Sequence, residues 1–359
     1  MALLVYGKFM GDPASRPTLQ SIAAAAGVSR MTASLALRNH PRISVATREK
    51  IHRLARELNY RPDPEVSRLM AHLRRQRPPQ YRPTIALITN AQRPGPWRLN
   101  RHFARFYEGA RQRAAELGYQ LEEFWLREPG LARARLTKIL QTRSIEGLLI
   151  GPLYRPSGRL ALDFDQFAVA EHGQDIWVPR IHRANHDHFQ GMMLAMRQLL
   201  RLGYQKIGAI FLENYHRHDV HTWEGAYHYH QQKLKPADRL APFLSEMQDR
   251  KGVVAWVRKH RPEAVVSSHL EVKFWLTEAE IAIPRDVSFV YLDWLDDSNA
   301  CAGINQHYEI VAAAAVDLVV GQLQRHERGL PPFSKLVLIE GEWVAGPTVR
   351  DRRTARSGR

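Results

Sequence analysis

The pattern of apolar residues changes at residue 84, and this change predicts two kinds of fold in one chain. Before residue 84, apolar residues recur at the three- and four-residue spacing of short helices. From residue 84 onward, apolar strands alternate with helices. The expected strands cover 84–89, 145–150, 206–211, 264–267 and 287–292, and the expected helices cover 103–117, 192–202 and 310–323. This alternation predicts parallel sheets in an α/β body that is long enough for two lobes.

The first two helical patterns are separated by a short corner. Thr18 is a good cap for the first helix, and Gly27 ends it because glycine readily takes the left-handed conformation. Val28 is expected to be buried at the corner, and Ser29 caps the second helix. The inward apolar positions are Leu19, Ile22, Ala23, Ala26, Ala33, Leu35, Ala36 and Leu37. Two helices joined by a tight turn with glycine are the helix-turn-helix pattern.

A third helix completes this small unit. Ser44 begins it, and its apolar positions are Ile51, Leu54, Ala55 and Leu58. We expect a three-helix core that holds the second helix outward. The amino-terminal half of that helix would then be free to enter the major groove of DNA.

The outer side of the second helix carries side chains that are able to read bases. Arg30 can donate two hydrogen bonds to guanine, Met31 can touch a thymine methyl group, and Ser34 can bond to a base or a phosphate. The alternative is that Arg30 is only solvated and that Met31 fills a gap in the core.

Hydroxyl groups and positive charge surround this helix. The predicted phosphate contacts are Thr18, Ser29, Thr32, Ser44 and Thr47, all at or near helix amino ends. Helix capping alone is the other role for each of them. Residues 1–83 hold 15 Lys or Arg and 5 Asp or Glu, a net charge of +10 out of +16 for the whole chain. Such a density attracts polyanions, with RNA and anionic lipid as alternatives to DNA.

These residues resemble the DNA-binding headpiece of the lactose-repressor/galactose-repressor (LacI/GalR) family. The similarity rests on the fixed spacing of Thr18-Leu19, Ile22-Ala23, Gly27-Val28-Ser29, Thr32-x-Ser34, Ser44-x2-Thr47-Arg48-Glu49-Lys50-Ile51 and Leu58-Asn59-Tyr60-Arg61-Pro62. The resemblance implies that a hinge helix follows, capped by Asp63 with Pro64 at its first position. It also implies that Leu69 is a wedge in the minor groove of the operator. The alternative is a linker helix with Leu69 packed on the next domain.

The resemblance continues through "IEGLLIGP", "LLRLGYQKIGAIF", "IPRDVSFVYLD" and "GINQ", and so covers 18–350. It implies a core like a periplasmic sugar-binding protein, whose chain crosses between two lobes three times around an effector cleft. The effector-binding residues expected near strand ends are Asn90, Trp97, His182, Arg183, Tyr215, Trp223, His269, Asp293, Trp294 and Gln306. Three family positions differ, since Thr222, Ser268-His269 and Tyr291 replace the usual arginine, asparagine-aspartate pair and glycine. The effector is therefore a larger or unusual glycan, an acidic or phosphorylated ligand drawn by Arg183 and histidines, or absent.

The sequence predicts five segments. They are a disordered leader (1–15), the helix-turn-helix headpiece (16–63), a hinge helix with a basic, proline-rich linker (64–83), the effector-binding core (84–350) and a basic tail (351–359). Lobe one is expected over about 84–201 and 303–325, and lobe two over about 202–302 and 326–350. No apolar run approaches the ~18 residues of a membrane span, and the start lacks the features of a signal peptide, which favours a cytoplasmic location.

The expected function is a sequence-specific transcription regulator, a repressor, that binds a pseudo-palindromic operator as a homodimer and responds to a small-molecule effector, a carbohydrate. The alternative is a solute-binding protein of the sugar-binding type without a role on DNA.

The sequence contains no nucleophile elbow, phosphate loop or paired metal-ligand motif, so neither an enzyme nor a cofactor is expected. Cys301 is the single cysteine, which excludes a cysteine-based zinc site. The histidine-rich stretch 214–230 is expected to be a polar loop, with metal binding and pH sensing as alternatives.

Overall fold

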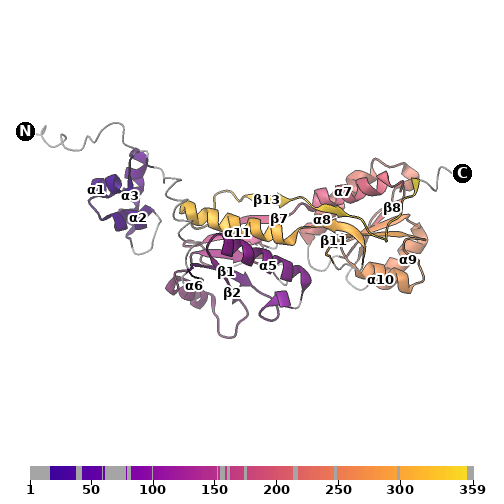
Figure 1. The fold of residues 1–359 in the computed structure, drawn as a ribbon, viewed down its shortest axis with the longest axis horizontal. Helices are drawn as coiled ribbons and strands as arrows, with labels where there is room; N and C mark the ends of the chain where they lie inside the picture. Colours follow the sequence, from indigo (N-terminus) through magenta and orange to yellow (C-terminus); the bar gives the residue numbers. More distant parts are fainter. Residues whose placement is uncertain are drawn as a thin grey trace, which may run out of the picture.

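The computed structural model arranges the chain as a small helical headpiece followed by two α/β lobes in a row, with the headpiece and the carboxyl end at opposite ends of the molecule (Figure 1). The described residues are 17–37, 43–58, 60, 78, 82–98, 100–151, 153, 158–159, 162–173, 176–212, 217–245, 249–296 and 300–353. The leader, the hinge helix with Leu69, Tyr215 and most of the linker lie outside these ranges. None of the described helices combines the length and apolar character needed to cross a membrane.

The headpiece is the expected three-helix unit. Its helices are α1 (Leu19–Ala26), α2 (Arg30–Leu37) and α3 (Val45–Glu57). Small side chains let the helices approach closely, because Ala23, Ala33 and Ala36 pack against Ile22 and Ile51 in one buried cluster. Several expected apolar positions are less buried than predicted. Leu58 follows the end of α3 and is 39% exposed, and half-buried positions are Leu19, Val28, Leu35, Leu37 and Leu54.

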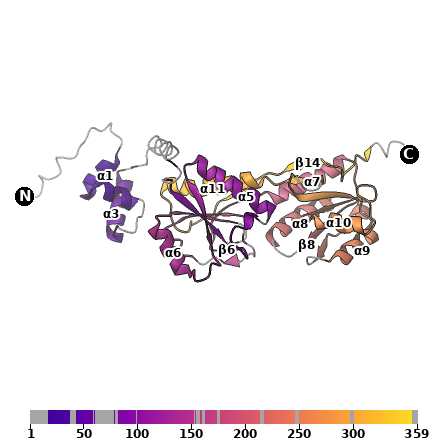
Figure 2. The same ribbon diagram turned by 60° about the horizontal axis from the view of Figure 1, so that its bottom comes forward.

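The first lobe contains a six-stranded parallel sheet in the order β13-β7-β5-β3-β1-β2. Helices α5 (Arg101–Glu116) and α11 (Tyr308–Arg325) cover one face, and α6 (Arg133–Thr142) covers the other (Figure 2). The strands are β1 (Thr84–Thr89), β2 (Gln120–Trp125), β3 (Gly147–Ile150), β5 (Ala168–His172), β7 (His182–His186) and β13 (Leu336–Ile339). The expected strand 84–89 and the helices near 103–117 and 310–323 are confirmed within a few residues.

The second lobe repeats this architecture with the sheet order β14-β12-β11-β10-β8-β9, in which only β14 is antiparallel to its neighbour. Helices α7 (His188–Arg201) and α8 (Arg217–Gln231) pack on one face, while α9 (Arg250–His260) and α10 (Glu271–Glu278) pack on the other. The strands are β8 (Ile207–Leu212), β9 (Phe243–Ser245), β10 (Ala264–Ser267), β11 (Ser288–Trp294), β12 (Ala302–Asn305) and β14 (Glu342–Val344). Smaller elements are η2 (Pro96–Arg98), η3 (Pro236–Asp238), β4 (Gly158–Arg159) and β6 (Ile176–Val178).

The chain crosses between the lobes three times: after β7, after β12 and between β13 and β14. The expected lobe boundaries were therefore wrong in two places. Helix α7 belongs to the second lobe, because Met192, Ala195 and Leu199 are buried against that sheet. Strand β13 belongs to the first lobe, where it pairs with β7. The sequence reading missed both because no glycine or proline interrupts the chain between β7 and α7, and because the two last strands are only short apolar runs.

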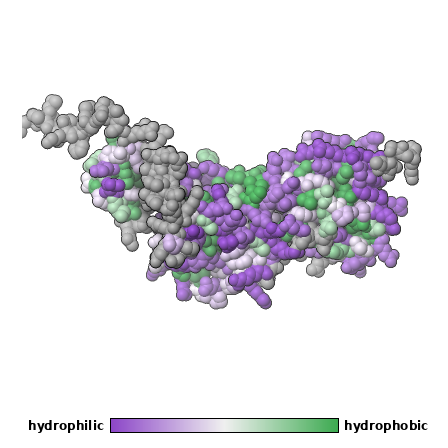
Figure 3. Space-filling model, in the orientation of Figure 1, coloured by the Kyte–Doolittle hydropathy of each residue, from purple (hydrophilic) through white to green (hydrophobic). Residues whose placement is uncertain are grey.

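The surface is mostly hydrophilic on the face in Figure 3, with an apolar patch near the middle of the molecule, over β13. Leu336 and Leu338 of β13 are 48% and 44% exposed, and Phe333 just before the strand is 86% exposed. β13 is the edge strand of its sheet, and Leu336 and Leu338 are two residues apart and so project from the same face of it.

Candidate DNA-reading helix and lobe junction

The corner of the headpiece is set by local hydrogen bonds. The Thr18 hydroxyl accepts a hydrogen bond from the backbone N–H of Ser21 (3.2 Å), and the Ser21 hydroxyl accepts one from the N–H of Thr18 (2.9 Å), which forms a reciprocal cap on α1. Gly27 ends the helix at φ 70°, ψ 33°. A Cβ atom at Gly27 would meet no atom within 4 Å, so the backbone conformation, and not lack of space, requires glycine.

The beginning of α2 presents its side chains to solvent. Met31 is 69% exposed and Arg30 is exposed, while Ala33 and Ala36 of the same helix are buried. The alternative in which Met31 fills a core gap is therefore wrong. Ser34 is half-buried. This arrangement leaves Arg30 and Met31, with Ser34 beside them, available to base edges.

Three of the predicted phosphate-binding hydroxyls, those of Thr18, Ser29 and Ser44, accept a hydrogen bond from a backbone N–H at a helix start. The Ser29 hydroxyl accepts a hydrogen bond from the N–H of Thr32 (3.0 Å) and lies 2.9 Å from the Thr32 hydroxyl. The Ser44 hydroxyl accepts one from the N–H of Thr47 (3.2 Å) and lies 2.8 Å from the Thr47 hydroxyl. These bonds fix the hydroxyl groups at exposed helix ends. Each hydroxyl group keeps further hydrogen-bonding capacity that is not used by the cap.

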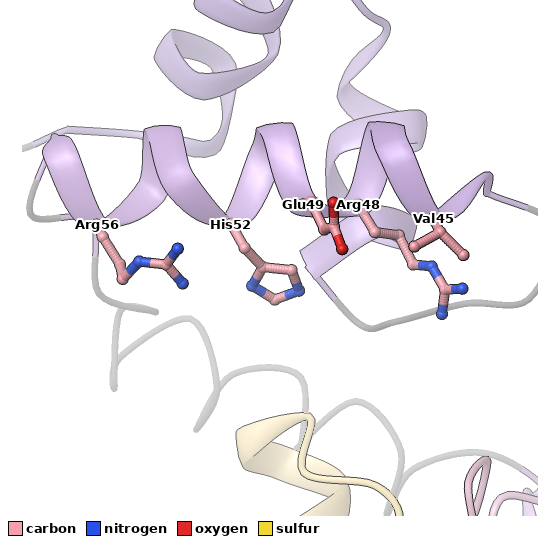
Figure 4. A pocket seen from close by; sticks show the side chains of 5 residues that line it. All are labelled: Val45, Arg48, Glu49, His52 and Arg56. Carbon is pink, nitrogen blue, oxygen red and sulfur yellow. The ribbon is translucent and has the colours of Figure 1, made fainter.

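One side of α3 adds further positive charge. Val45, Arg48, Glu49, His52 and Arg56 line a shallow hollow and point away from the other two helices (Figure 4). Burial lowers the pKa of His52, and the positive charge of Arg56 lowers it further. Because His52 is thereby kept neutral near pH 7, the charge of this face comes from the two arginines and Glu49.

The second candidate site lies where the two lobes meet. His172 and His186 occupy the carboxyl ends of β5 and β7, and both are buried. The Nδ1 of His186 donates to the backbone oxygen of Gln306 (2.6 Å), and the side-chain amide of Gln306 donates to the carbonyl of Leu292 in β11 (2.7 Å). A chain of hydrogen bonds thus links a strand end of the first lobe to the sheet of the second.

Tyr308, the first residue of α11, lies at the centre of this junction. Its ring centroid is 4.5 Å from that of His186, 5.0 Å from that of His102 and 6.3 Å from that of His172. Its hydroxyl donates to Oδ1 of Asp293 (2.7 Å), and Nε2 of His102 lies 3.1 Å from Oδ2 of the same carboxylate. Asp293 at the end of β11 therefore receives two contacts from first-lobe side chains.

Two further contacts extend the junction on either side. Arg105 of α5 forms ion pairs with Glu309 of α11 (2.8 Å) and with Asp296 of the second lobe. In the other direction, His188 at the start of α7 packs edge-on against Trp223 of α8, with ring centroids 4.5 Å apart. Trp223 is buried, and in the described part of the chain no acceptor is within hydrogen-bond distance of its indole N–H.

The structure brings some of the expected effector residues to this junction and separates others. Asp293, Gln306 and Trp223 belong to it, as described above. Asn90 and His269 follow the carboxyl ends of β1 and β10. Two tryptophans pack within their own lobes: Trp97 stacks on Tyr107 at 4.0 Å, and the indole N–H of Trp294 donates to the carbonyl of Cys301 (3.0 Å).

His182 and Arg183 do not lie at the lobe junction. They begin β7, whose carboxyl end is His186, so they sit toward the amino end of the sheet. His182 Nδ1 accepts a hydrogen bond from the N–H of Lys335 (3.0 Å), and Arg183 lies 3.4 Å from the buried carboxylate of Glu171. This polar pair was predicted to follow a strand end because β7, which the pair begins, was not among the predicted strands.

The histidine-rich stretch is also different from the expectation. Residues 217–231 form α8, so the predicted polar loop is wrong for this part. His221 and His228 flank Glu224 at 3.7 and 3.3 Å, and both histidine side chains are at least half exposed. Among the described residues, no group of three His, Cys, Asp or Glu side chains is placed to hold a metal ion.

The histidines and the tyrosine of the junction were not predicted from the sequence. The residues missed are His102, His172, His186, His188 and Tyr308. The available signal was a histidine at the carboxyl end of β5, in "AVAEH", and a histidine at each end of β7, in "HRANHDH". Because a histidine at a strand end also packs well in a protein core, this signal does not by itself indicate a site.

The headpiece and the two-lobed core together define a class: a helix-turn-helix domain in front of a core of the periplasmic-binding-protein type. Residues 18–63 match the family described as bacterial regulatory proteins, lacI family. The regulator CelR of Thermobifida fusca is 28% identical over 199 residues, which are 54% of this chain and 55% of that protein. The headpiece of this chain is therefore similar to the DNA-binding headpiece of the lacI family.

Solved structures show the same fold. A CelR–cellobiose complex superposes with a TM-score of 0.54 at 20% identity, covering 93% of this chain and 100% of that one. A lac repressor dimer bound to operator and the anti-inducer ONPF superposes with a TM-score of 0.54 at 20% identity, covering 94% and 100%. In sequence, the chain matches only about half the length of its curated relatives.

Proposed function

We propose that this protein is a transcription regulator, a repressor, that binds a pseudo-palindromic operator as a homodimer and responds to a small-molecule effector between its lobes. The observation that carries the proposal is the exposed start of α2. Arg30 and Met31 project from a helix whose other side is locked into a three-helix core. A single headpiece of this size covers only a half-site, so two copies are needed for a full operator.

Different residues of the headpiece contact the bases and the phosphates of DNA in this proposal. Arg30, Met31 and Ser34 contact base edges, and the capped hydroxyls of Thr18, Ser29, Thr32, Ser44 and Thr47 contact phosphates. The hinge residue Leu69, which lies outside the described residues, acts as the wedge in the minor groove. The net charge of +10 in residues 1–83 supplies the attraction to the duplex and makes binding dependent on salt.

The effector in this proposal is a carbohydrate. CelR, a relative, has been solved with cellobiose. In this chain, the aromatic side chains at the lobe junction can stack on a sugar ring, and the buried N–H of Trp223 can donate to a hydroxyl group. Arg183 is committed to the buried Glu171, which argues against its drawing an acidic ligand to the junction.

Regulation follows from the contacts that hold the lobes together. Tyr308, His102 and Arg105 of the first lobe bond to carboxylates at the end of β11 in the second. A ligand that favours one arrangement of these contacts over another shifts the angle between the lobes. Such coupling between two sites typically changes affinity by about 1–3 kcal/mol.

The test is selection of bound duplexes from a random pool, followed by affinity measurements on the selected sequence. The full chain should enrich a two-fold symmetric motif. Arg30→Ala should lose about 1–3 kcal/mol on that motif and become tolerant at one base pair in each half-site. Lys235→Ala, which removes an exposed charge in the second lobe, is the matched control and should bind normally. If no duplex is enriched, or if Arg30→Ala weakens binding equally to all sequences, the proposal fails.

A further inference from the structure

A groove of about 640 Å³ opens on the second lobe, at the end of the sheet opposite to the lobe junction. It runs across the amino ends of β10 and β11, between the end of α9 and residues 350–352. Its volume is in the range of small-molecule sites. None of the residues that line it takes part in the junction or the headpiece, so the proposed function leaves it without a role.

The groove has an excess of positive charge. Five arginines line it, against two acidic residues, Glu263 and Asp286. The two carboxylates each have a partner already: Glu263 pairs with Arg352 at 2.9 Å, and Asp286 pairs with Arg285 at 3.0 Å.

No salt bridge to a described residue is formed by the other three arginines, Arg258, Arg261 and Arg350, although the charge of Arg350 also helps to lower the pKa of Asp286. Arg258 donates one hydrogen bond to the carbonyl of Ala279 (3.0 Å), and Arg350 donates one to the carbonyl of Arg285 (3.1 Å). Each contact occupies only one of the five N–H donors of a guanidinium group. The remaining N–H donors of each positively charged guanidinium group lie beside the concave surface of the groove. There they can donate hydrogen bonds to the oxygen atoms of an anion.

The wall of the groove is held in place by a buried tyrosine. The Tyr204 hydroxyl bonds to the Ser288 hydroxyl (2.6 Å), donates to the carbonyl of Arg350 (2.9 Å) and accepts from the N–H of Arg350 (3.1 Å). The Arg352 guanidinium lies 5.3 Å above the same ring. The segment that carries Arg350 is therefore fixed to the sheet, so little ordering is needed when a ligand binds.

We propose that this groove binds a small molecule that carries two or more phosphate charges, at a site separate from the effector site between the lobes. Arginine favours this chemistry, because its planar fork bonds phosphate oxygens in pairs. Pro262, Ile281 and Pro284 supply an apolar wall for the uncharged part of the ligand. Five guanidinium groups against two carboxylates leave the groove with a net charge of +3, which matches a pyrophosphate better than a singly charged anion.

The experiment is calorimetric titration of the full chain with inorganic pyrophosphate at moderate salt, with orthophosphate as a second ligand. Wild type should bind pyrophosphate at one saturable site per chain and orthophosphate at least about tenfold more weakly. Arg261→Asn and Arg350→Ala should each weaken pyrophosphate about tenfold or more, as expected for loss of charge-assisted hydrogen bonds. Asparagine is chosen at 261 because that residue has φ 46°, a left-handed conformation that asparagine tolerates well.

Lys251→Ala is the matched control, because it removes one exposed charge from the first turn of α9, at the other end of the helix from Arg258. It should leave pyrophosphate binding unchanged. The basic headpiece contributes equally to all of these variants, so only the groove distinguishes them. Equal affinity in wild type and both groove variants would overturn the proposal, as would an equal loss in Lys251→Ala. Groove variants that lose affinity for a random short duplex but keep pyrophosphate binding would also overturn it.

Discussion

The close approach of α5 and α11 provides a sharp test of packing in the first lobe. Gly109 lies in the middle of α5 and faces the first turn of α11. A Cβ atom at this position would overlap the Cα and carbonyl oxygen of Glu309 and lie 2.8 Å from its carbonyl carbon. Because these are backbone atoms, no side-chain rotation relieves the overlap, and the two helices must move apart.

Gly109→Ala should therefore destabilise the protein. Overpacking typically costs about 1–3 kcal/mol, and a backbone obstacle places this case at the upper end. Replacing glycine by alanine within a helix recovers about 0.5–1 kcal/mol. The net expectation is a loss of about 2 kcal/mol in the free energy of unfolding. Glu309 and Tyr308 are in the turn that moves, so the contacts between the lobes should also weaken.

The same substitution at Gly225 is expected to change the free energy of unfolding in the opposite direction. It lies in α8, and a Cβ atom there would meet nothing within 4 Å. Gly225→Ala should stabilise by about 0.5–1 kcal/mol through helix propensity alone. Urea unfolding of both variants, followed by far-ultraviolet circular dichroism, measures the difference. If the two variants shift stability in the same direction, the packing argument for α5 and α11 is refuted.

Three further predictions concern the corner, the junction and the amino end of the first sheet. Gly27→Ala should cost the headpiece about 1–2 kcal/mol, because alanine must adopt φ 70°; faster amide exchange in α1 and α2 is the readout. Tyr308→Phe keeps the ring contacts but removes the hydrogen bond to Asp293, so it should widen the angle between the lobes in small-angle scattering. Burial and the charge of Lys335 lower the pKa of His182 below 6.5, so the folded state favours the neutral ring. The stability that this provides is complete above pH 6.5 and is lost as the pH falls through the folded pKa. Wild type should thus lose more stability than His182→Asn between neutral and mildly acidic pH.

The sequence was sufficient to predict the headpiece because its signals are local. A cap, a left-handed glycine and an apolar spacing each act within one or two helical turns, and Thr18, Gly27 and Ser44 occupy the predicted positions. The strands of the core were predicted where they are buried on both faces, as β1 and β8 are. β13 was missed because its burial alternates, so only two of its four residues face the core.

The lobe junction was less predictable because its contacts join residues far apart in the sequence. His102 and Asp293 are 191 positions apart, and no local spacing connects them. The choice of tryptophans as effector residues shows the same limit. Trp97 lies in η2 after β1 and Trp294 is the last residue of β11, so both are near strand ends as expected. Each nevertheless has a partner that only the folded chain brings beside it. His182 was misplaced because a polar residue near an apolar run can precede a strand as well as end it.

The last crossing between the lobes affects how the protein is made. β13 completes the first sheet and β14, three residues later, completes the second, while the strands they pair with were translated earlier. During synthesis, β7 and β12 therefore each lack one neighbouring strand until the segment around residues 336–344 has left the ribosome. A nascent chain stopped before this point would expose the edges of β7 and β12 that β13 and β14 later cover, and would be prone to associate with other nascent chains.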